Sequence, residues 1–232
     1  MENSEIGTKG LERPSEITTF LFGGRCISAE DASAFPVLAS GPDLTPPNTT
    51  IAFSSMESFA RWGRTTKYAE SIQETLLQIS KVQERERDKA SVERIQARQK
   101  LIVERYAQDL LELAKHMELE VGSMELFEAA SSKADPLQLP IFDPVGLSDT
   151  TDPWKWTIPF RDWLPLGGGW WPDLGWFGWN DRAVSGRVSG LAAFCEHTWF
   201  RGRWLWLAGF PVWPYQFGWW GFSRIISSAI IL

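Results

Sequence analysis

The residue types best suited to chemistry stand together once, at Cys195-Glu196-His197, where a thiol, a carboxylate and an imidazole are consecutive. A cysteine nucleophile needs a histidine within hydrogen-bond reach. Consecutive side chains point in different directions on a helix or a strand, so these three do not form such a pair. The other histidine, His116, is distant in the sequence. We therefore predict no catalytic residues and a protein that is not an enzyme.

Metal and cofactor motifs are also absent from the sequence. Zinc sites use spaced pairs such as CxxC or HxxxH, and neither spacing occurs here. The run Gly167-Gly168-Gly169 lacks both the Lys-Ser/Thr of a phosphate loop and the GxGxxG spacing of a dinucleotide site, so we expect a flexible joint. We predict no metal, no cofactor and no small-molecule substrate. We expect Cys26 and Cys195 to be free thiols.

Aspartates recur through the second half of the chain. Two of them beside tryptophan rings would resemble the carboxylate pair of a sugar-cleaving site, but we favour solvated loop positions as the explanation. These residues are Asp143, Asp149, Asp152, Asp162, Asp173 and Asp181.

Tryptophan is concentrated in one region, since all but Trp62 of the 14 tryptophans lie between Trp154 and Trp220. Indole has a large apolar ring and one N–H that needs a partner when buried, so it suits interfaces and the membrane–water boundary. The uncharged stretch 204–223 contains prolines and glycines that argue against a membrane-spanning helix. We predict that a membrane surface or a partner is contacted by Trp199, Arg201, Arg203, Trp204, Trp206, Trp213, Trp219, Trp220 and Arg224.

Three other interpretations of the Trp-rich region stay open. Its aromatic residues could form an ordinary core against a helix of the same chain. They could also stack on carbohydrate or single-stranded nucleic acid, although the net charge of −6 gives no strong nucleic-acid signal. Finally, the region could be poorly structured, because Gly, Trp and Arg share G-rich codons and the change in composition after residue 136 fits an overlapping reading frame.

A long helical segment precedes this region. No Pro or Gly occurs from Thr65 to Val121, and the stretch is rich in helix formers. Apolar residues recur at helical and heptad spacing, which predicts a coiled-coil-like seam. We favour one continuous helix over a hairpin that bends in the charged segment 83–89. Because a lone helix cannot bury its own stripe, we expect binding to itself or to another helical protein. The predicted interface consists of Ile95, Ile102, Val103, Tyr106, Leu110, Leu113 and Met117.

Composition divides the chain into four segments: a disordered or loop-rich part (1–63), a helical part (64–135), a Pro/Asp linker (136–153) and the Trp-rich part (154–232). In the last part, residues 188–200 are the best helix candidate. The predicted fold class is mainly α. It comprises one long amphipathic helix or helical hairpin with short flanking helices, an irregular Trp/Gly/Pro-rich C-terminal region and a largely disordered N-terminus.

The first residues show no basic stretch followed by an apolar one, so we expect an intracellular protein, either free or at the periphery of a membrane. The predicted function is that of a non-enzymatic interaction or structural accessory protein, in the style of a viral minor structural protein. It would bind itself or a partner through the helix and contact a membrane surface or a larger assembly through the Trp-rich region. The alternative is a binding module for carbohydrate or single-stranded nucleic acid that uses tryptophan platforms.

Overall fold

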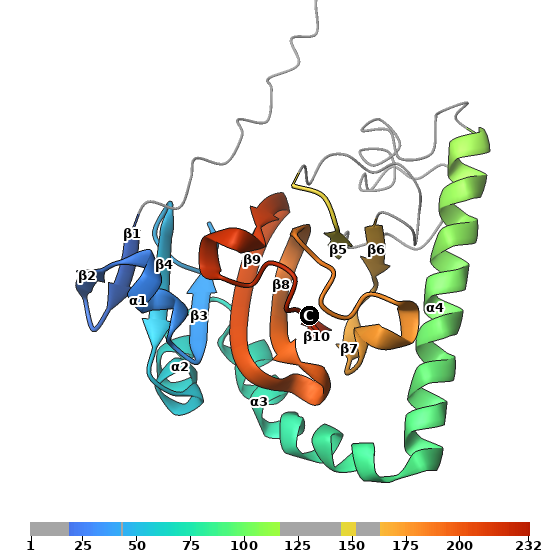
Figure 1. Ribbon diagram of the computed structural model, residues 1–232, viewed down its shortest axis with the longest axis horizontal. Coiled ribbons are helices and arrows are strands. Elements are labelled where there is room, and N and C mark those ends of the chain that lie inside the picture. Colours follow the sequence, from blue (N-terminus) through green and yellow to red (C-terminus); the bar gives the residue numbers. More distant parts are fainter. Residues whose placement is uncertain (1–18, 43, 117–144, 152–162) are drawn as a thin grey trace, which may run out of the picture.

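A ten-stranded mixed sheet organises the protein (Figure 1). The computed structural model describes residues 19–42, 44–116, 145–151 and 163–232. The prediction of a mainly helical fold is therefore wrong, and the Trp-rich region is part of a regular sheet. The strands are β1 (Thr19–Phe22), β2 (Arg25–Ile27), β3 (Val37–Ser40), β4 (Thr49–Phe53), β5 (Val145–Ser148), β6 (Trp163–Leu166), β7 (Gly169–Trp171), β8 (Ser185–His197), β9 (Arg201–Gln216) and β10 (Ser228–Ile231).

Helical segments cover about as much of the described chain as the strands do. Most of them are short, and the two long ones follow each other between the N-terminal strands and β5. They are α1 (Ala29–Ser33), α2 (Met56–Gly63), α3 (Ala69–Glu84), η1 (Arg85–Arg87), α4 (Lys89–His116), η2 (Leu174–Phe177), η3 (Thr198–Phe200) and η4 (Phe217–Trp220).

The sheet joins the N-terminal and C-terminal parts of the chain. Its strand order is β2-β1-β4-β3-β9-β8-β10-β7, and β5 pairs with both β6 and β8. The pairs β1/β4 and β3/β9 are parallel and the remaining ladders are antiparallel. Four of the strands come from residues 19–53, so the prediction of a largely disordered N-terminus is wrong for the residues that the structure describes.

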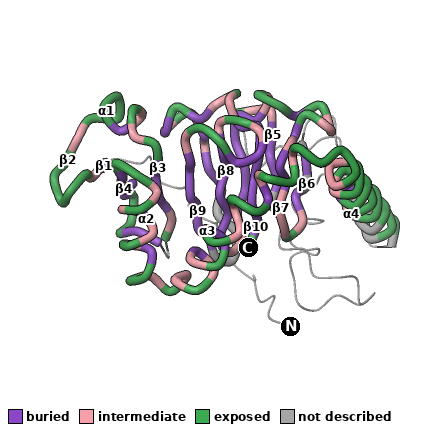
Figure 2. Tube along the Cα trace, turned by 90° about the horizontal axis from the view of Figure 1, so that it is seen from below, coloured by how far each residue is buried: buried purple, intermediate pink, exposed green. Residues whose placement is uncertain are grey.

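Both faces of the central sheet are buried, and the alternation along β9 shows how. Trp204 and Trp206 belong to one core cluster, whereas Leu205 and Leu207 belong to the other. Successive side chains of a strand point to opposite faces, so one apolar run fills two cores. Figure 2 shows burial along most of the described length of β8, β9 and β10. A strand buried on both faces has an unbroken apolar sequence. Sequence alone does not distinguish such a strand from an apolar segment at a protein or membrane interface.

The segment 188–200, predicted as a helix, forms most of β8 and the turn η3 instead. Its alanines favour a helix locally, but Ala192 and Ala193 pair with Leu207 and Trp206 on one side and with β10 on the other. A small side chain at each of these two positions leaves room for the large rings of the neighbouring strand. Tertiary packing therefore overrides the local propensity.

The two long helices meet at a sharp bend, so the expected continuous helix is wrong. The bend lies in the charged segment 83–89, where the less favoured hairpin alternative placed it. Asp88 has an extended backbone (φ −101°, ψ 103°) between η1 and α4. Its carboxylate accepts hydrogen bonds from the Ala90 backbone N–H at 3.3 Å and from the Ser91 hydroxyl. These bonds satisfy the first turn of a new helix, as an N-cap does. Because the hydrogen bond from Ser91 favours the charged form, the pKa of the Asp88 carboxyl is held below its usual range.

The described part of the stripe expected to form a coiled coil packs on the protein's own sheet, so the coiled-coil prediction is wrong. Val103 is 6% exposed and belongs to one core cluster, with Ile102 packed beside it. Ile95 packs against the other cluster, together with Val82 of α3. Helix α4 thus covers the edge of the sheet near β6 and β7 rather than a partner helix (Figure 1).

Candidate functional site

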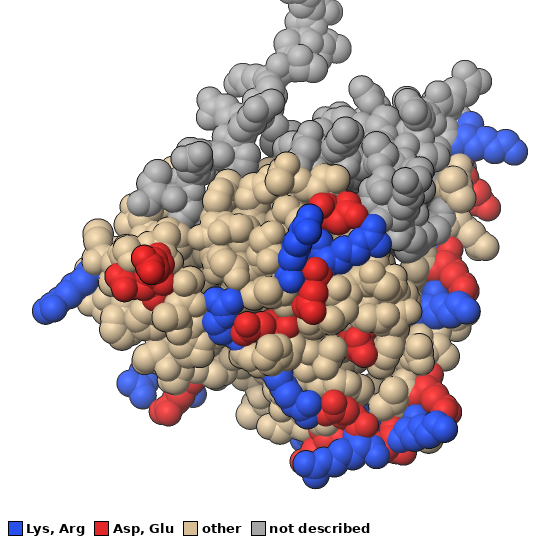
Figure 3. Space-filling view, in the orientation of Figure 1, with Lys and Arg blue, Asp and Glu red and all other residues tan. Residues whose placement is uncertain are grey.

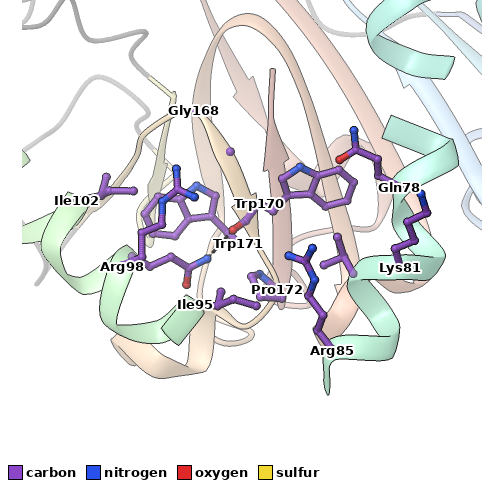
Figure 4. A pocket seen from close by; sticks show the side chains of 13 residues that line it. Gln78, Lys81, Arg85, Ile95, Arg98, Ile102, Gly168, Trp170, Trp171 and Pro172 are labelled. Carbon is purple, nitrogen blue, oxygen red and sulfur yellow. Dashed lines mark hydrogen bonds between the residues drawn. The ribbon is translucent and has the colours of Figure 1, made fainter. Parts of the chain in front are cut away.

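A pocket of about 430 Å³ lies where α3, α4 and β7 meet. Figure 4 shows Arg85 and Arg98 on the two helical segments, on either side of Pro172. The volume of the pocket falls within the range of small-molecule sites in proteins. The described lining residues are Gln78, Lys81, Val82, Arg85, Ile95, Arg98, Gln99, Ile102, Gly168, Gly169, Trp170, Trp171 and Pro172.

The two helical walls have the same spacing. Positions 78, 81, 82 and 85 line one wall, and positions 95, 98, 99 and 102 line the other. Residues three, four and seven apart share one face of a helix, so each wall is a single helical stripe. Each stripe combines an apolar floor with polar and basic side chains. The bend at Asp88 brings the two stripes to the same cavity.

Three cations line the pocket: Lys81, Arg85 and Arg98. None of the described lining residues is acidic, and no hydrogen bond or ion pair among the described residues involves these three side chains. Elsewhere on the helices the signs alternate, as Figure 3 shows along the edge formed by α4. The pocket is therefore a local excess of positive charge on an otherwise balanced surface.

The third wall is β7, and it is held rigidly. Trp170 pairs with Ile230 of β10, and its carbonyl accepts a hydrogen bond from the Gln99 side-chain amide at 2.5 Å. Gln99 is only 4% exposed, so this bond is shielded from water. The Trp171 indole N–H donates to the Gly167 carbonyl at 2.8 Å. These contacts fix the backbone under both indoles.

Behind Trp170, the turn between β8 and β9 supports its ring. Phe200 meets the Trp170 indole edge to face, with 5.2 Å between the ring centroids. Trp199 and Phe200 both have left-handed backbones (φ 56° and 58°), which is unusual for aromatic residues. The Gln83 side chain donates to both of their carbonyls, at 3.0 and 3.1 Å. A strained turn is thus held in place by α3, and it positions the ring that backs the pocket wall.

Acidic groups near the pocket have partners of their own. Glu86 is paired with Arg201, and the guanidinium Nη1 lies 3.2 Å from a carboxylate oxygen. Asp173 follows Pro172 and accepts the Gly175 backbone N–H at 2.7 Å. Burial raises the pKa of the Asp173 carboxyl, and the charge of Glu86 adds to this effect against the opposing hydrogen bond from Gly175. Neither acid neutralises the pocket cations directly.

The interface residues predicted on the helix have different environments. Ile95 and Ile102 line the pocket, and Val103 lies in the core beside it. The positions of Tyr106, Leu110 and Leu113 lie on α4, but their side chains are outside the described part, and Met117 is outside the described residues. Their contact with a partner stays a prediction.

The predicted contact residues of the Trp-rich region also differ among themselves. Four of the indoles are at most 6% exposed, those of Trp199, Trp204, Trp206 and Trp220. Trp219 is half-buried, Arg224 is exposed, and the Trp213 side chain lies outside the described part. Contact between this set and a membrane or a partner stays a prediction.

The two arginines at the start of β9 bind within the protein. Arg201 pairs with Glu86, as described above. Arg203 donates to the Ser33 carbonyl at 2.6 Å, to the Gly221 carbonyl at 3.0 Å and to Glu196 at 3.3 Å. Its guanidinium also lies 4.8 Å from the centre of the Phe222 ring. Arg203 therefore ties β9 to α1 and to the segment after η4.

The consecutive Cys195, Glu196 and His197 do not assemble into a reactive site. Cys195 is fully buried, and burial raises the pKa of its thiol well above the ordinary value. His197 is exposed at the end of β8. Cys26 is exposed on β2, and the two cysteines are not bonded to each other. Among the described residues, no group of three or more His, Cys, Asp or Glu is placed to hold a metal ion.

Sequence reasoning missed the pocket residues Gln78, Lys81, Arg85, Arg98 and Gln99. The signal was present as basic and amide side chains at the same spacing as the apolar stripe. It could not be recognised without the bend that brings the two stripes together. The triple glycine, expected to be a flexible joint, packs against α4, because a Cβ at Gly167 would lie 3.2 Å from Ile102 Cγ2.

Comparison with known proteins gives no family. No family model matches the sequence, and no curated protein is significantly similar to it. A solved structure described as "Evolution of the eye lens beta-gamma-crystallin domain fold" is similar to part of the chain, with 20% identity and a TM-score of 0.33. The similar region covers 39% of this chain and 86% of that one. A likeness at this level defines neither the fold family nor the function of the chain.

The described helices also include none that is both long and apolar enough to cross a bilayer.

Proposed function

We propose that the protein is a non-enzymatic binding module for a small organic anion, held in the pocket between α3, α4 and β7. The observation that carries the proposal is that Lys81, Arg85 and Arg98 all line one cavity whose described lining contains no acid. A bound anion would offset this excess of positive charge and accept charge-assisted hydrogen bonds from it. Ile95 and Trp170 supply apolar area for the rest of the ligand.

The pocket favours binding over catalysis. Its described lining offers cations, amides and apolar side chains, with no carboxylate, imidazole or thiol. General acid–base and nucleophilic mechanisms depend chiefly on those missing groups. Guanidinium groups in a fixed position recognise an anion without changing it.

Isothermal titration calorimetry with two ligands that share one ring tests this proposal. At neutral pH, 1-naphthyl sulfate carries a charge and 1-naphthol does not, so we expect the sulfate to bind and the naphthol to bind at least about tenfold more weakly. Arg98→Gln should weaken sulfate binding by about tenfold. Arg61→Gln is the matched control, because it removes the same charge from a side chain that is 78% exposed on α2. Equal affinity for both ligands, or unchanged binding by Arg98→Gln, would contradict the proposal.

Self-association through α4 is a second candidate function. It is supported by Leu101 and Leu111, which are 66% and 52% exposed on this helix. Large apolar side chains left in water favour contact with another surface. Sedimentation equilibrium of the full chain should show a dimer that Leu101→Asp and Leu111→Asp together abolish. A wild-type monomer at high concentration would rule out this second function and leave the pocket proposal untouched.

A further inference from the structure

We infer that the ligand of this pocket is a phosphate monoester of a planar ring system, an inference that rests on the proposed anion-binding function. Three features of the pocket support it: the number of its cations, the fixed aromatic wall and the open glycine edge. Each restricts a different part of the ligand.

The number of cations indicates a doubly charged head group. Lys81, Arg85 and Arg98 face a cavity with no acid among its described lining residues, and the adjacent Glu86 is already paired with Arg201. A carboxylate or sulfate would offset a single charge of the three. A phosphate monoester carries between about −1.5 and −2 at neutral pH and presents three acceptor oxygens. Two guanidinium groups match such a head group because each can donate two parallel hydrogen bonds to it.

The aromatic wall indicates a planar group on the other end of the ligand. Trp170 is partly exposed on β7, and its backbone is fixed by Ile230 and by the buried Gln99. Phe200 supports the same indole from behind. An indole that does not need to be ordered on binding provides a stacking surface at low entropic cost. The neighbouring Ile95 and Pro172 extend that surface without adding polar groups.

The glycine edge keeps the cavity accessible. A Cβ added to Gly168 or to Gly169 would have no heavy atom within 4 Å, so both positions border open space. The Gly169 backbone has a φ of +127°, which other residues rarely adopt. Bare backbone at this edge leaves room for a rigid ring to slide in beside Trp170. This assigns a role to Gly168 and Gly169 that a flexible joint does not explain.

A polymer fits the pocket less well than a small molecule. Single-stranded nucleic acid is bound along grooves that carry several successive phosphate contacts. Here the unpaired cations converge on one cavity of about 430 Å³. Neutral carbohydrate would use the aromatic wall but would leave Lys81, Arg85 and Arg98 uncompensated.

The experiment compares four probes by calorimetry with the full chain: 1-naphthyl phosphate, 1-naphthyl sulfate, 1-naphthol and inorganic phosphate. At pH 7.5 we expect naphthyl phosphate to bind at least about tenfold more tightly than naphthyl sulfate, because the rings are identical and only the charge differs. Inorganic phosphate should bind at least about tenfold more weakly than naphthyl phosphate, because it lacks the stacked ring.

Lowering the pH sharpens the test. The second ionisation of a phosphate ester has a pKa of about 6, so its advantage over the sulfate should shrink toward pH 5. The cations that line the site are Lys81, Arg85 and Arg98. The nearby acids are Asp173 and the Glu86 paired with Arg201. Protonation of Asp173 as the pH falls would favour the phosphate dianion more than the sulfate, so it opposes the expected change and cannot produce it. A ratio of affinities that does not change with pH would overturn the assignment of a dianion.

A steric variant tests whether binding occurs in this cavity. Gly168→Val should weaken naphthyl phosphate by about tenfold or more, because its side chain occupies open space at the pocket edge. Gly218→Val is the matched control, since a Cβ added to Gly218 would also have no heavy atom within 4 Å, but this residue lies on η4 outside the pocket lining. Both variants should keep the wild-type circular dichroism. Unchanged binding of naphthyl phosphate by a folded Gly168→Val variant would overturn the placement of the binding site in this cavity.

The outcomes separate the two proposals. Equal affinity for naphthyl phosphate and naphthyl sulfate overturns the phosphate assignment but leaves the anion-binding function intact. Inorganic phosphate binding as tightly as naphthyl phosphate overturns the planar-ring assignment. Binding of none of the charged probes overturns both the ligand class and the proposed function.

Discussion

The central strands and the helical arm, residues 69–116, use their apolar side chains in opposite ways. On β8, β9 and β10 nearly every apolar residue whose side chain the structure describes is buried, and Trp206 is 0% exposed. On the arm, Val103 is buried at 6%, whereas Leu101, two residues away, is 66% exposed. The sheet therefore carries the stability of the protein, and the arm covers one edge of it. The pocket lies at the boundary between these two regions, where strand β7 of the sheet meets the less buried helices α3 and α4.

Removing a central tryptophan should have the largest effect on stability. Trp206 stacks on Trp204 with 6.1 Å between ring centroids and on Phe59 of α2 at 4.9 Å. Trp206→Ala should lower the free energy of unfolding by about 3–5 kcal/mol, as expected for a fully buried aromatic residue. Leu101→Ala on the arm should change it by no more than about 0.5 kcal/mol. Urea unfolding followed by circular dichroism measures both.

If Trp206→Ala does not fold, the milder variant Trp206→Phe can be compared with Leu101→Ala instead. Trp206→Phe retains part of the ring contact with Phe59 and should show a smaller loss of the same sign. Similar losses of unfolding free energy for Trp206→Phe and Leu101→Ala would show that the sheet and the arm contribute equally to stability. That result would contradict the burial pattern.

The helical arm was the more predictable of these two regions. The absence of Pro and Gly from 65 to 121 located α3 and α4 correctly, because local propensity determines such segments. The bend in the charged segment was only the less favoured alternative, although Asp88 followed by Ser91 is a recognisable N-cap pattern. The coiled-coil prediction failed because Ile95, Ile102 and Val103 are covered by the sheet of the same chain.

The Trp-rich region was less predictable for a physical reason. A run such as Trp204-Leu205-Trp206-Leu207 has the composition of an interface and also that of a strand buried on both faces. Only its partners decide between the two, and β3 is about 165 residues away in the sequence, as the pair Leu38 and Leu205 shows. The pocket depends on the same long-range information, since it needs α3, α4 and β7 together.

Adding one methyl group should separate the closed core from the open pocket. A Cβ at Gly41 would lie 2.1 Å from the Ala208 carbonyl oxygen, and the Gly41 φ of +133° disfavours other residues. Gly41→Ala should therefore destabilise the fold by about 1–3 kcal/mol. A Cβ at Gly168 would have no heavy atom within 4 Å, so the free energy of unfolding of Gly168→Ala should stay within about 0.5 kcal/mol of wild type. Thermal unfolding of both variants gives the measurement, and equal midpoints would refute the distinction.

The ion pair between Glu196 of β8 and Arg203 of β9 should have a smaller, pH-dependent effect. Burial opposes ionisation of Glu196, but hydrogen bonds from Arg203 and its charge outweigh burial and hold the pKa of the carboxyl below its usual range. A lowered pKa stabilises the fold above the unfolded-state pKa, and that contribution is lost as pH falls through the folded-state value. Glu196→Gln should cost about 1 kcal/mol at pH 7 and less at pH 3.5.

The control for Glu196 is an acid on the surface. Glu57 pairs with Arg61 at 3.4 Å, but both side chains are more than three-quarters exposed, at 84% and 78%. Glu57→Gln should therefore leave the urea midpoint nearly unchanged at both pH values. A loss at pH 7 as large as that of Glu196→Gln would mean that exposure does not decide the strength of these pairs.

The smallest expected effect tests the contact between the two regions themselves. Burial raises the pKa of Asp173, beside the pocket, and the charge of Glu86 on the arm contributes to the shift. A raised pKa stabilises the fold below the unfolded-state pKa, and that stabilisation is lost as pH rises through the folded-state value. Asp173→Asn should therefore be slightly more stable than wild type at pH 7, with no gain below pH 4. Because Glu86 reaches Asp173 only when the arm is docked, the gain should shrink in a Glu86→Gln background. An unchanged gain in the double variant would mean that burial alone shifts Asp173 and that the arm exerts no electrostatic influence on the pocket edge.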